Sequence, residues 1–113
     1  MTYSNALTAL ADPTRRQVFE RLRTGGQPVG RIAQTLPVSR PAVSQHLKIL
    51  KEAGLVRETR DGTRRIYEID PKGLGQLRRW LDEFWDVALD SFRAEAEKDE
   101  GEPEWLPPSR LRR

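Results

Sequence analysis

The stretch VSRPAVSQHLKILKEAGLV, residues 38–56, concentrates residue types that hydrogen-bond to nucleic acids. Arginine can pair bidentately with guanine, glutamine can do so with adenine, and serine can donate to a phosphate or a base. A helix that starts after Ser39 gathers these types near its N-terminus, where the backbone dipoles also favour phosphate. We therefore predict duplex DNA as the partner of one polar surface, made of Ser39, Arg40, Pro41, Ser44, Gln45 and Lys48.

The same stretch has an apolar side that turns toward a protein core. Val43, Leu47 and Leu50 recur four and three residues apart, so they share one helix face. The polar stripe continues to Lys51, and a solvated surface is its simplest alternative reading. Such a surface is usually rich in Glu and Lys pairs, whereas residues 40–48 contain no acid. The pattern favours the DNA-facing interpretation, and the solvated face stays open as the alternative.

A second basic segment follows, LVRETRDGTRRIYEI at residues 55–69. The dipeptide Asp61-Gly62 predicts a hairpin with a two-residue type I′ turn, which places Glu58 opposite Arg65. We expect the hairpin to follow the DNA backbone or enter the minor groove. The alternative is an exposed strand edge guarded by charge. The arginines expected to contact DNA are Arg57, Arg60, Arg64 and Arg65.

No residue pattern points to catalysis. His46, the only histidine, flanks the apolar stripe, so we expect a structural role with its ring bonded to a carbonyl. Ser44 lies two residues before His46, and residues two apart on a helix point about 200° apart, so they cannot form a catalytic pair. The expectation is a protein that is not an enzyme and needs no cofactor.

Capping residues and periodicity predict the elements that position these side chains. Asp12-Pro13 and Asp70-Pro71 each look like an N-cap followed by a helical first residue. PVS, residues 37–39, is a tight turn between two helices, the skeleton of a helix-turn-helix unit. The predicted helices cover residues 3–11, a segment from Pro13 that ends with Gly25 as C′ residue, 29–36, 40–53 closed by Gly54, and 71–98.

Composition bounds the remaining possibilities. A length of 113 residues suits one domain, which we place at residues 1–98, followed by a charged and proline-rich tail, residues 99–113, where Trp105 and Leu106 could dock back. The chain lacks cysteine, which excludes disulfides and thiolate sites. Residues 1–16 do not show the charged segment and long apolar run of a signal sequence, and no apolar stretch is long enough for a membrane, so we expect a cytoplasmic protein. Residues 1–70 hold twelve Lys/Arg and seven Asp/Glu, and this basic excess suits a polyanion partner.

Taken together, ALADPTRRQVFERL, the 38–56 stretch, RDGTRRIYEI and the long helix after Pro71 resemble the ArsR/SmtB family of bacterial winged-helix repressors, over residues 5–95. The resemblance implies a mostly α-helical winged helix-turn-helix fold with a small β-hairpin. It also implies a homodimer built from the first and last helices, and repression by occlusion of a palindromic promoter operator, often the protein's own. The wide apolar stripe of the last helix suits such an interface, although core burial is a competing explanation for part of it. The expected interface residues are Leu7, Leu10, Leu74, Leu77, Leu81, Phe84, Trp85, Ala88 and Phe92.

The chain departs from the metal-sensing members of that family. Pro28 and Gly30 stand where those members carry two cysteines, and the last helix has carboxylates at Asp82, Glu83, Asp86 and Asp90 but no histidine. We therefore expect no metal site. Two alternatives stay open: a winged-helix module that binds another protein, and a small-molecule site beside Trp80, Phe84 and Trp85. The sequence names neither an effector nor an operator.

Overall fold

The computed structural model describes the backbone of residues 2–99 and the side chains of residues 5–98. The chain divides into two compact units, Met1–Arg79 and Trp80–Arg113. Residues 100–113 lie outside the described part, and with them most of the predicted tail and the expected docking of Trp105 and Leu106.

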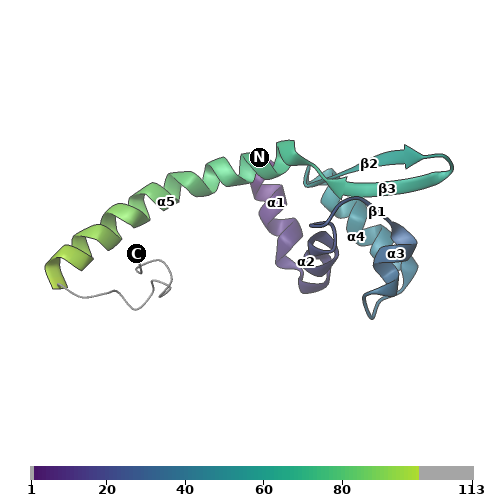
Figure 1. Ribbon diagram of the computed structural model, residues 1–113, viewed down its shortest axis with the longest axis horizontal. Coiled ribbons are helices and arrows are strands. Elements are labelled where there is room, and N and C mark those ends of the chain that lie inside the picture. Colours follow the sequence, from purple (N-terminus) through teal and green to yellow (C-terminus); the bar gives the residue numbers. More distant parts are fainter. Residues whose placement is uncertain (1, 100–113) are drawn as a thin grey trace. The chain divides into compact units, whose positions relative to one another are not determined.

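The first unit begins with two helices joined at Asp12, α1 (Thr2–Ala11) and α2 (Pro13–Glu20) (Figure 1). The predicted cap is confirmed, because the Asp12 carboxylate accepts a hydrogen bond from the Arg15 backbone N–H at 2.9 Å. Two α2 side chains in turn bond the last carbonyls of α1, which have no partner within that helix. Arg15 Nε donates to Ala9 O at 2.6 Å, and Arg16 Nη1 donates to Leu10 O at 3.0 Å.

The end of α2 differs from the prediction. Arg21 is the C-cap of this helix, so the assignment of Gly25 as its C′ residue is wrong. Leu22 stays in the core at 2% exposure, and the chain leaves the helix there through a turn instead of continuing it. Gly25, with a φ of 132°, closes that turn through a bond from its N–H to Leu22 O.

The next elements are a two-residue strand, β1 (Gln27–Pro28), and two helices, α3 (Val29–Gln34) and α4 (Arg40–Glu52). Helix α3 ends two residues before the predicted boundary. Its C-cap is Thr35, whose hydroxyl donates to Ile32 O at 2.8 Å and so occupies a carbonyl at the end of the helix. Helix α4 has the predicted N-cap, since Ser39 Oγ accepts from Ala42 N–H at 3.2 Å. Gly54 follows α4 with a φ of 84°, as a closing glycine should.

Two longer strands, β2 (Val56–Asp61) and β3 (Arg64–Ile69), form the predicted hairpin, and β1 joins it in an antiparallel sheet of order β1-β3-β2. The predicted turn is displaced by one residue. Asp61 pairs with Arg64, so the loop is Gly62-Thr63 and not Asp61-Gly62. Glu58 consequently lies opposite Tyr67, not Arg65. This register keeps Tyr67 buried at 7% exposure and lets Gln27 pair with it from β1.

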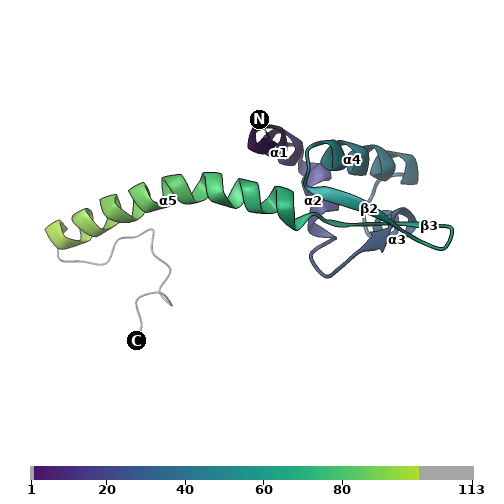
Figure 2. The same ribbon diagram turned by 90° about the horizontal axis from the view of Figure 1, so that it is seen from above.

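One hydrophobic core joins these elements of the first unit. Val43, Leu47 and Leu50 of α4 are all 0% exposed, which confirms the predicted apolar face. They share the core with Ile32 of α3 and Leu55 ahead of β2. In Figures 1 and 2 α4 lies beside the sheet, and its contact with β2 fixes the hairpin to the helix.

The last helix, α5 (Pro71–Asp99), begins in the first unit and forms the described part of the second. Its predicted start is confirmed, because Asp70 Oδ1 accepts from Lys72 N–H at 3.0 Å. Gly73 lies against the Gly54 carbonyl at the end of α4. In the second unit the rings of Trp80 and Phe84, one helical turn apart, meet edge to face at 5.0 Å. None of the described helices is long and apolar enough to cross a membrane.

Candidate nucleic-acid interface

A groove of about 980 Å³ runs between α4 and the β2–β3 hairpin, entirely within the first unit. Four of the six predicted residues of α4 and its cap line it, as do two of the four predicted hairpin arginines. These residues are Arg40, Ser44, Gln45, Lys48, Arg64 and Arg65. Ser39 and Pro41 are exposed at the start of α4 and do not line the groove. The fold thus brings together two segments that are separate in the sequence.

The N-terminus of α4 has a local electrostatic environment that favours a negatively charged group. Ser39 satisfies one N–H of the first turn, no acid lies in that turn, and Pro41 brings no N–H of its own. The remaining N–H groups and the helix dipole favour a phosphate there. The Arg40 guanidinium lies over Gly30 of α3, with its Cζ 3.4 Å from the place a Cβ of residue 30 would take. A Cβ at position 30 would be in ordinary van der Waals contact with Arg40, so the Arg40 side chain lies directly over α3.

Several groove residues were not predicted as site residues. Lys51 belongs to the predicted polar stripe of α4 but lies one turn beyond the residues assigned to DNA contact. Arg31 and Gln34 come from α3, and Glu58 and Thr63 come from the hairpin. Lys51 could have been assigned from its helical spacing. The α3 and hairpin residues carry no such signal, because their approach to α4 depends on tertiary packing.

The charge of the groove is strongly unbalanced. Six of its lining residues are Lys or Arg, and Glu58 is the single acid among them. Glu58 Oε1 lies 3.2 Å from Lys51 Nζ, and its Oε2 lies 3.4 Å from Arg65 Nε. The hydrogen bond from Lys51 holds the pKa of Glu58 below its ordinary value of 4.5, and the nearby charges of Arg65 and Arg60 act in the same direction. The predicted attraction between Glu58 and Arg65 is therefore present, but along a diagonal of the sheet.

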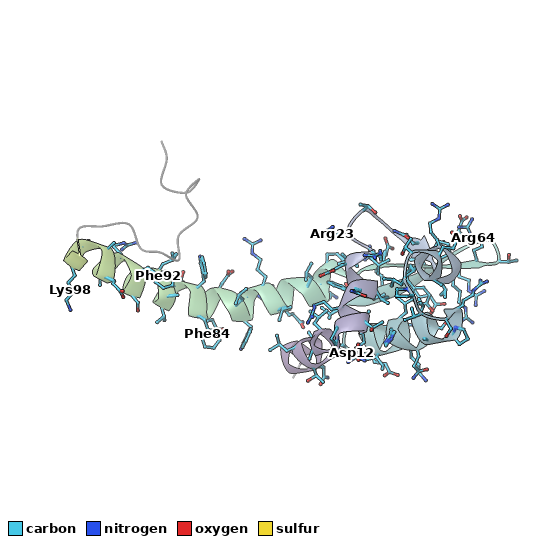
Figure 3. All side chains as sticks on the ribbon, turned by 90° about the horizontal axis from the view of Figure 1, so that it is seen from below. Asp12, Arg23, Arg64, Phe84, Phe92 and Lys98 are labelled. Carbon is cyan, nitrogen blue, oxygen red and sulfur yellow. The ribbon has the colours of Figure 1, made fainter. Side chains whose placement is uncertain are left out.

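The hairpin arginines occupy different surroundings. Side chains alternate along a strand, so Arg57 lies on the face away from Glu58. There it pairs with Glu68 of β3, Nε to Oε1 at 3.2 Å, and it does not line the groove. Arg60 stands directly opposite Arg65, a like-charge arrangement whose repulsion the nearby Glu58 carboxylate offsets. Arg64 is exposed near the hairpin loop and lines both the groove and the adjoining hollow beside Arg31 (Figure 3).

His46 lacks a hydrogen bond at one of its two ring nitrogens within the described part of the chain. It is half-buried on α4, but its Nδ1 is shielded from solvent and has no hydrogen-bond partner among the described residues. The predicted bond from the ring to a carbonyl is therefore not made at Nδ1. His46 does not line the groove.

The predicted dimer residues fall into two groups. Leu10 and Leu77 are half-buried against the core of their own unit, so part of their apolar surface is already used. The exposed group includes Phe84, labelled in Figure 3, at 55% and Leu81 at 53%. Leu7, Leu74 and Trp85 are also exposed, whereas Ala88 and Phe92 are half-buried. Beyond the predicted set, Val87 is 66% exposed.

Within the described part of the chain, no three His, Asp or Glu side chains gather where they could hold a metal ion. The carboxylates of α5, Asp82, Glu83, Asp86 and Asp90, form no such group. The sequence-based expectation that this protein senses no metal stays a prediction.

Several known proteins match this chain over most of the first unit or more. Residues 10–59 match the family described as a helix-turn-helix domain. The HTH-type transcriptional regulator Rv2034 of Mycobacterium tuberculosis is 58% identical over 87 residues, which are 77% of this chain and 81% of that protein. The transcriptional repressor SdpR of Bacillus subtilis is 33% identical over 78 residues, 69% of this chain and 87% of that protein.

The fold has matching relatives among solved structures. One is the homodimeric winged helix-turn-helix DNA-binding domain of a possible ArsR-family transcriptional regulator from Mycobacterium bovis. It aligns with a TM-score of 0.62 at 29% identity, covering 80% of this chain and 83% of that chain. The mostly helical winged helix-turn-helix fold predicted from the sequence is confirmed, and the matched proteins are named as transcriptional regulators. By its fold, its basic groove and its relatives, the chain belongs to the ArsR/SmtB family of winged helix-turn-helix transcriptional regulators, which bind DNA.

Proposed function

We propose that this protein is a homodimeric repressor that binds a palindromic promoter operator, including one at its own gene. The observation that carries the proposal is the groove in which the polar stripe of α4 faces the arginines of the hairpin. SdpR is named a repressor, and the Mycobacterium bovis domain is homodimeric, which supports both parts of the proposal. Action at a promoter also supports the cytoplasmic location expected from the sequence.

In this proposal α4 is the recognition helix and enters the major groove. Arg40, Ser44 and Gln45 lie in its first two turns, the part of a recognition helix that contacts base edges. The N-terminus at Ser39 and Pro41, together with Lys48, would contact phosphate. The hairpin would lie along the adjacent backbone, with the exposed Arg64 at its loop.

The exposed apolar side chains of α5 support self-association. Leu81, Phe84 and Trp85 are each between 45% and 55% exposed, which is more apolar surface than a stable monomer usually leaves in one place. A two-fold dimer pairs the same patch from both copies. It would also present two recognition helices to successive major grooves, about 34 Å apart.

We propose further that repression does not depend on a metal held at α3. Proline and glycine carry no ligating side chain, and by the family resemblance Pro28 and Gly30 stand where metal-sensing members carry two cysteines.

Selection from a random-sequence duplex pool, followed by fluorescence anisotropy, tests the function. The enriched site should contain two inverted half-sites with centres about 10–10.5 base pairs apart. Substituting Arg40 or Gln45 by alanine should cost about 1–3 kcal/mol on the selected site and relax base preference there. Enrichment of no site, with equal weak binding to every duplex, would instead favour the protein-interaction module.

A pair of hairpin variants tests the role of the wing. Arg64→Ala should weaken binding to all sequences alike and reduce the salt slope by about 1. Arg57→Ala is the matched control, because Arg57 is already paired with Glu68 on the other face of the hairpin. The same effect from both variants would contradict the proposed orientation of the hairpin. Binding to the duplex upstream of the protein's own gene then tests autoregulation.

A further inference from the structure

The groove holds one carboxylate among six cations, and that carboxylate bridges the two elements that form it. Glu58 of β2 bonds Lys51 of α4 through one oxygen and Arg65 of β3 through the other, at 3.2 and 3.4 Å. The Glu58 side chain is 18% exposed, whereas the side chains of Lys51 and Arg65 are 52% and 59% exposed. The acid therefore lies deeper than the two cations, and both cations fold back onto it from the solvent side.

This arrangement has an electrostatic consequence for DNA binding. Sequence-independent affinity comes from Lys and Arg that neutralise phosphates and release counterions. Lys51 and Arg65 are near enough to the groove to do so, but each must first give up its bond to Glu58. Their contribution to phosphate binding is reduced as long as the carboxylate is present.

From this geometry, and resting on the proposed function, we infer that Glu58 is a specificity-determining residue that limits the binding of non-operator DNA. On an operator, base contacts from the start of α4 set the position of the protein, so a freed cation reaches only the phosphates near that position. On other DNA the protein can shift along the backbone to whichever phosphates the freed cations reach. Removing the charge of Glu58 therefore strengthens non-operator binding more than operator binding.

The test compares Glu58→Gln with Glu68→Gln, by anisotropy on a scrambled duplex between 50 and 200 mM salt and on the selected operator. Both changes remove one acid of the hairpin that is bonded to arginine, but Glu68 pairs with Arg57 away from the groove. If Lys51 and Arg65 each gain a phosphate, the salt slope of Glu58→Gln on the scrambled duplex steepens by about 1.8, so affinity falls roughly 12-fold more across that salt range. The double variant Glu58→Gln, Arg65→Gln should lose about half of that increase.

The expected result is tighter binding of the scrambled duplex at 50 mM salt and a smaller ratio of operator to scrambled affinity for Glu58→Gln alone. Equal effects of Glu58→Gln and Glu68→Gln overturn the inference while the proposed function stands. Weaker binding of both duplexes by a folded Glu58→Gln protein also overturns it, since the bridge would then serve only to hold the hairpin in place. Wild-type protein that binds no duplex overturns the inference and the proposed function together.

Discussion

Two glycines of α5, two residues apart, should respond in opposite ways to the same substitution. An alanine Cβ at Gly73 would lie 2.6 Å from the Gly54 carbonyl carbon and would overlap its oxygen. An alanine Cβ at Gly75 would meet only Arg79 Nη1, at 3.9 Å. Gly73 is therefore the point at which α5 packs directly on the end of α4, whereas Gly75 leaves room for a Cβ.

The magnitude follows from two opposing terms. Alanine is favoured over glycine within a helix by about 1 kcal/mol, so Gly75→Ala should stabilise the protein by about that amount. At Gly73 the same gain is opposed by overpacking, which costs about 1–3 kcal/mol. The upper end of this range applies, because the clashing atoms belong to the Gly54 backbone, which cannot rotate away as a side chain could. The neighbouring Leu55 holds the Gly54 segment in place through bonds to Leu50 O and from Asp70 N–H, at 3.0 and 2.9 Å.

The expected net effect of Gly73→Ala is a loss of about 2 kcal/mol, and the two variants should differ by about 3 kcal/mol. In a domain of this size that difference separates their melting temperatures by more than about 10 °C. Thermal unfolding followed by circular dichroism, at one protein concentration, measures the gap. Equal melting temperatures for the two variants would refute the close approach of α5 to α4.

Three further substitutions test the end of α1, the N-cap of α2 and the exposed apolar side chains of α5. Arg15→Met removes the guanidinium that donates to Ala9 O and Thr8 O. Urea unfolding should show a free energy of unfolding lower by about 1–3 kcal/mol. An unchanged unfolding midpoint would mean that the end of α1 does not depend on these bonds. The backbone bond from Arg15 lowers the pKa of Asp12 below 3.8, so its ionised form adds stability above pH 3.8 that is lost as pH falls through the lower folded pKa. Asp12→Asn, whose side chain can still cap the helix, should therefore be less stable than wild type at neutral pH. The difference should shrink as the pH falls below 3.8. Leu81→Glu places a charge among the exposed apolar side chains of α5. Sedimentation experiments should show the dimer dissociation constant raised at least about tenfold. An unchanged dissociation constant would mean that the dimer interface does not include Leu81.

Local chemistry explains why much of this fold could be predicted. Asp12, Ser39 and Asp70 each cap a helix with their own side chain, a bond that spans two or three residues and needs no other element. The spacing of Val43, Leu47 and Leu50 likewise defined the buried face of α4 before any partner was known. The polar stripe of α4 follows from the same periodicity, since it occupies the face that these residues leave exposed.

The tertiary structure decided what depends on pairing between distant segments. Gln27 and Pro28 form a strand only because Tyr67 and Ile66 of β3 offer an edge to them, and two residues carry no periodic signal. The Asp61-Gly62 dipeptide predicted a turn, but the burial of Tyr67 and its pairing set the register one residue further along. The sequence by itself therefore determined where the helices lie, the N-terminal caps of α2, α4 and α5, and the polar stripe of α4, because these arise from contacts within a few residues. The groove and the bridge at Glu58 exist only where α4 and the hairpin meet, and the Arg57–Glu68 pair exists only where β2 and β3 pair, because side chains this far apart along the chain acquire neighbours only through packing.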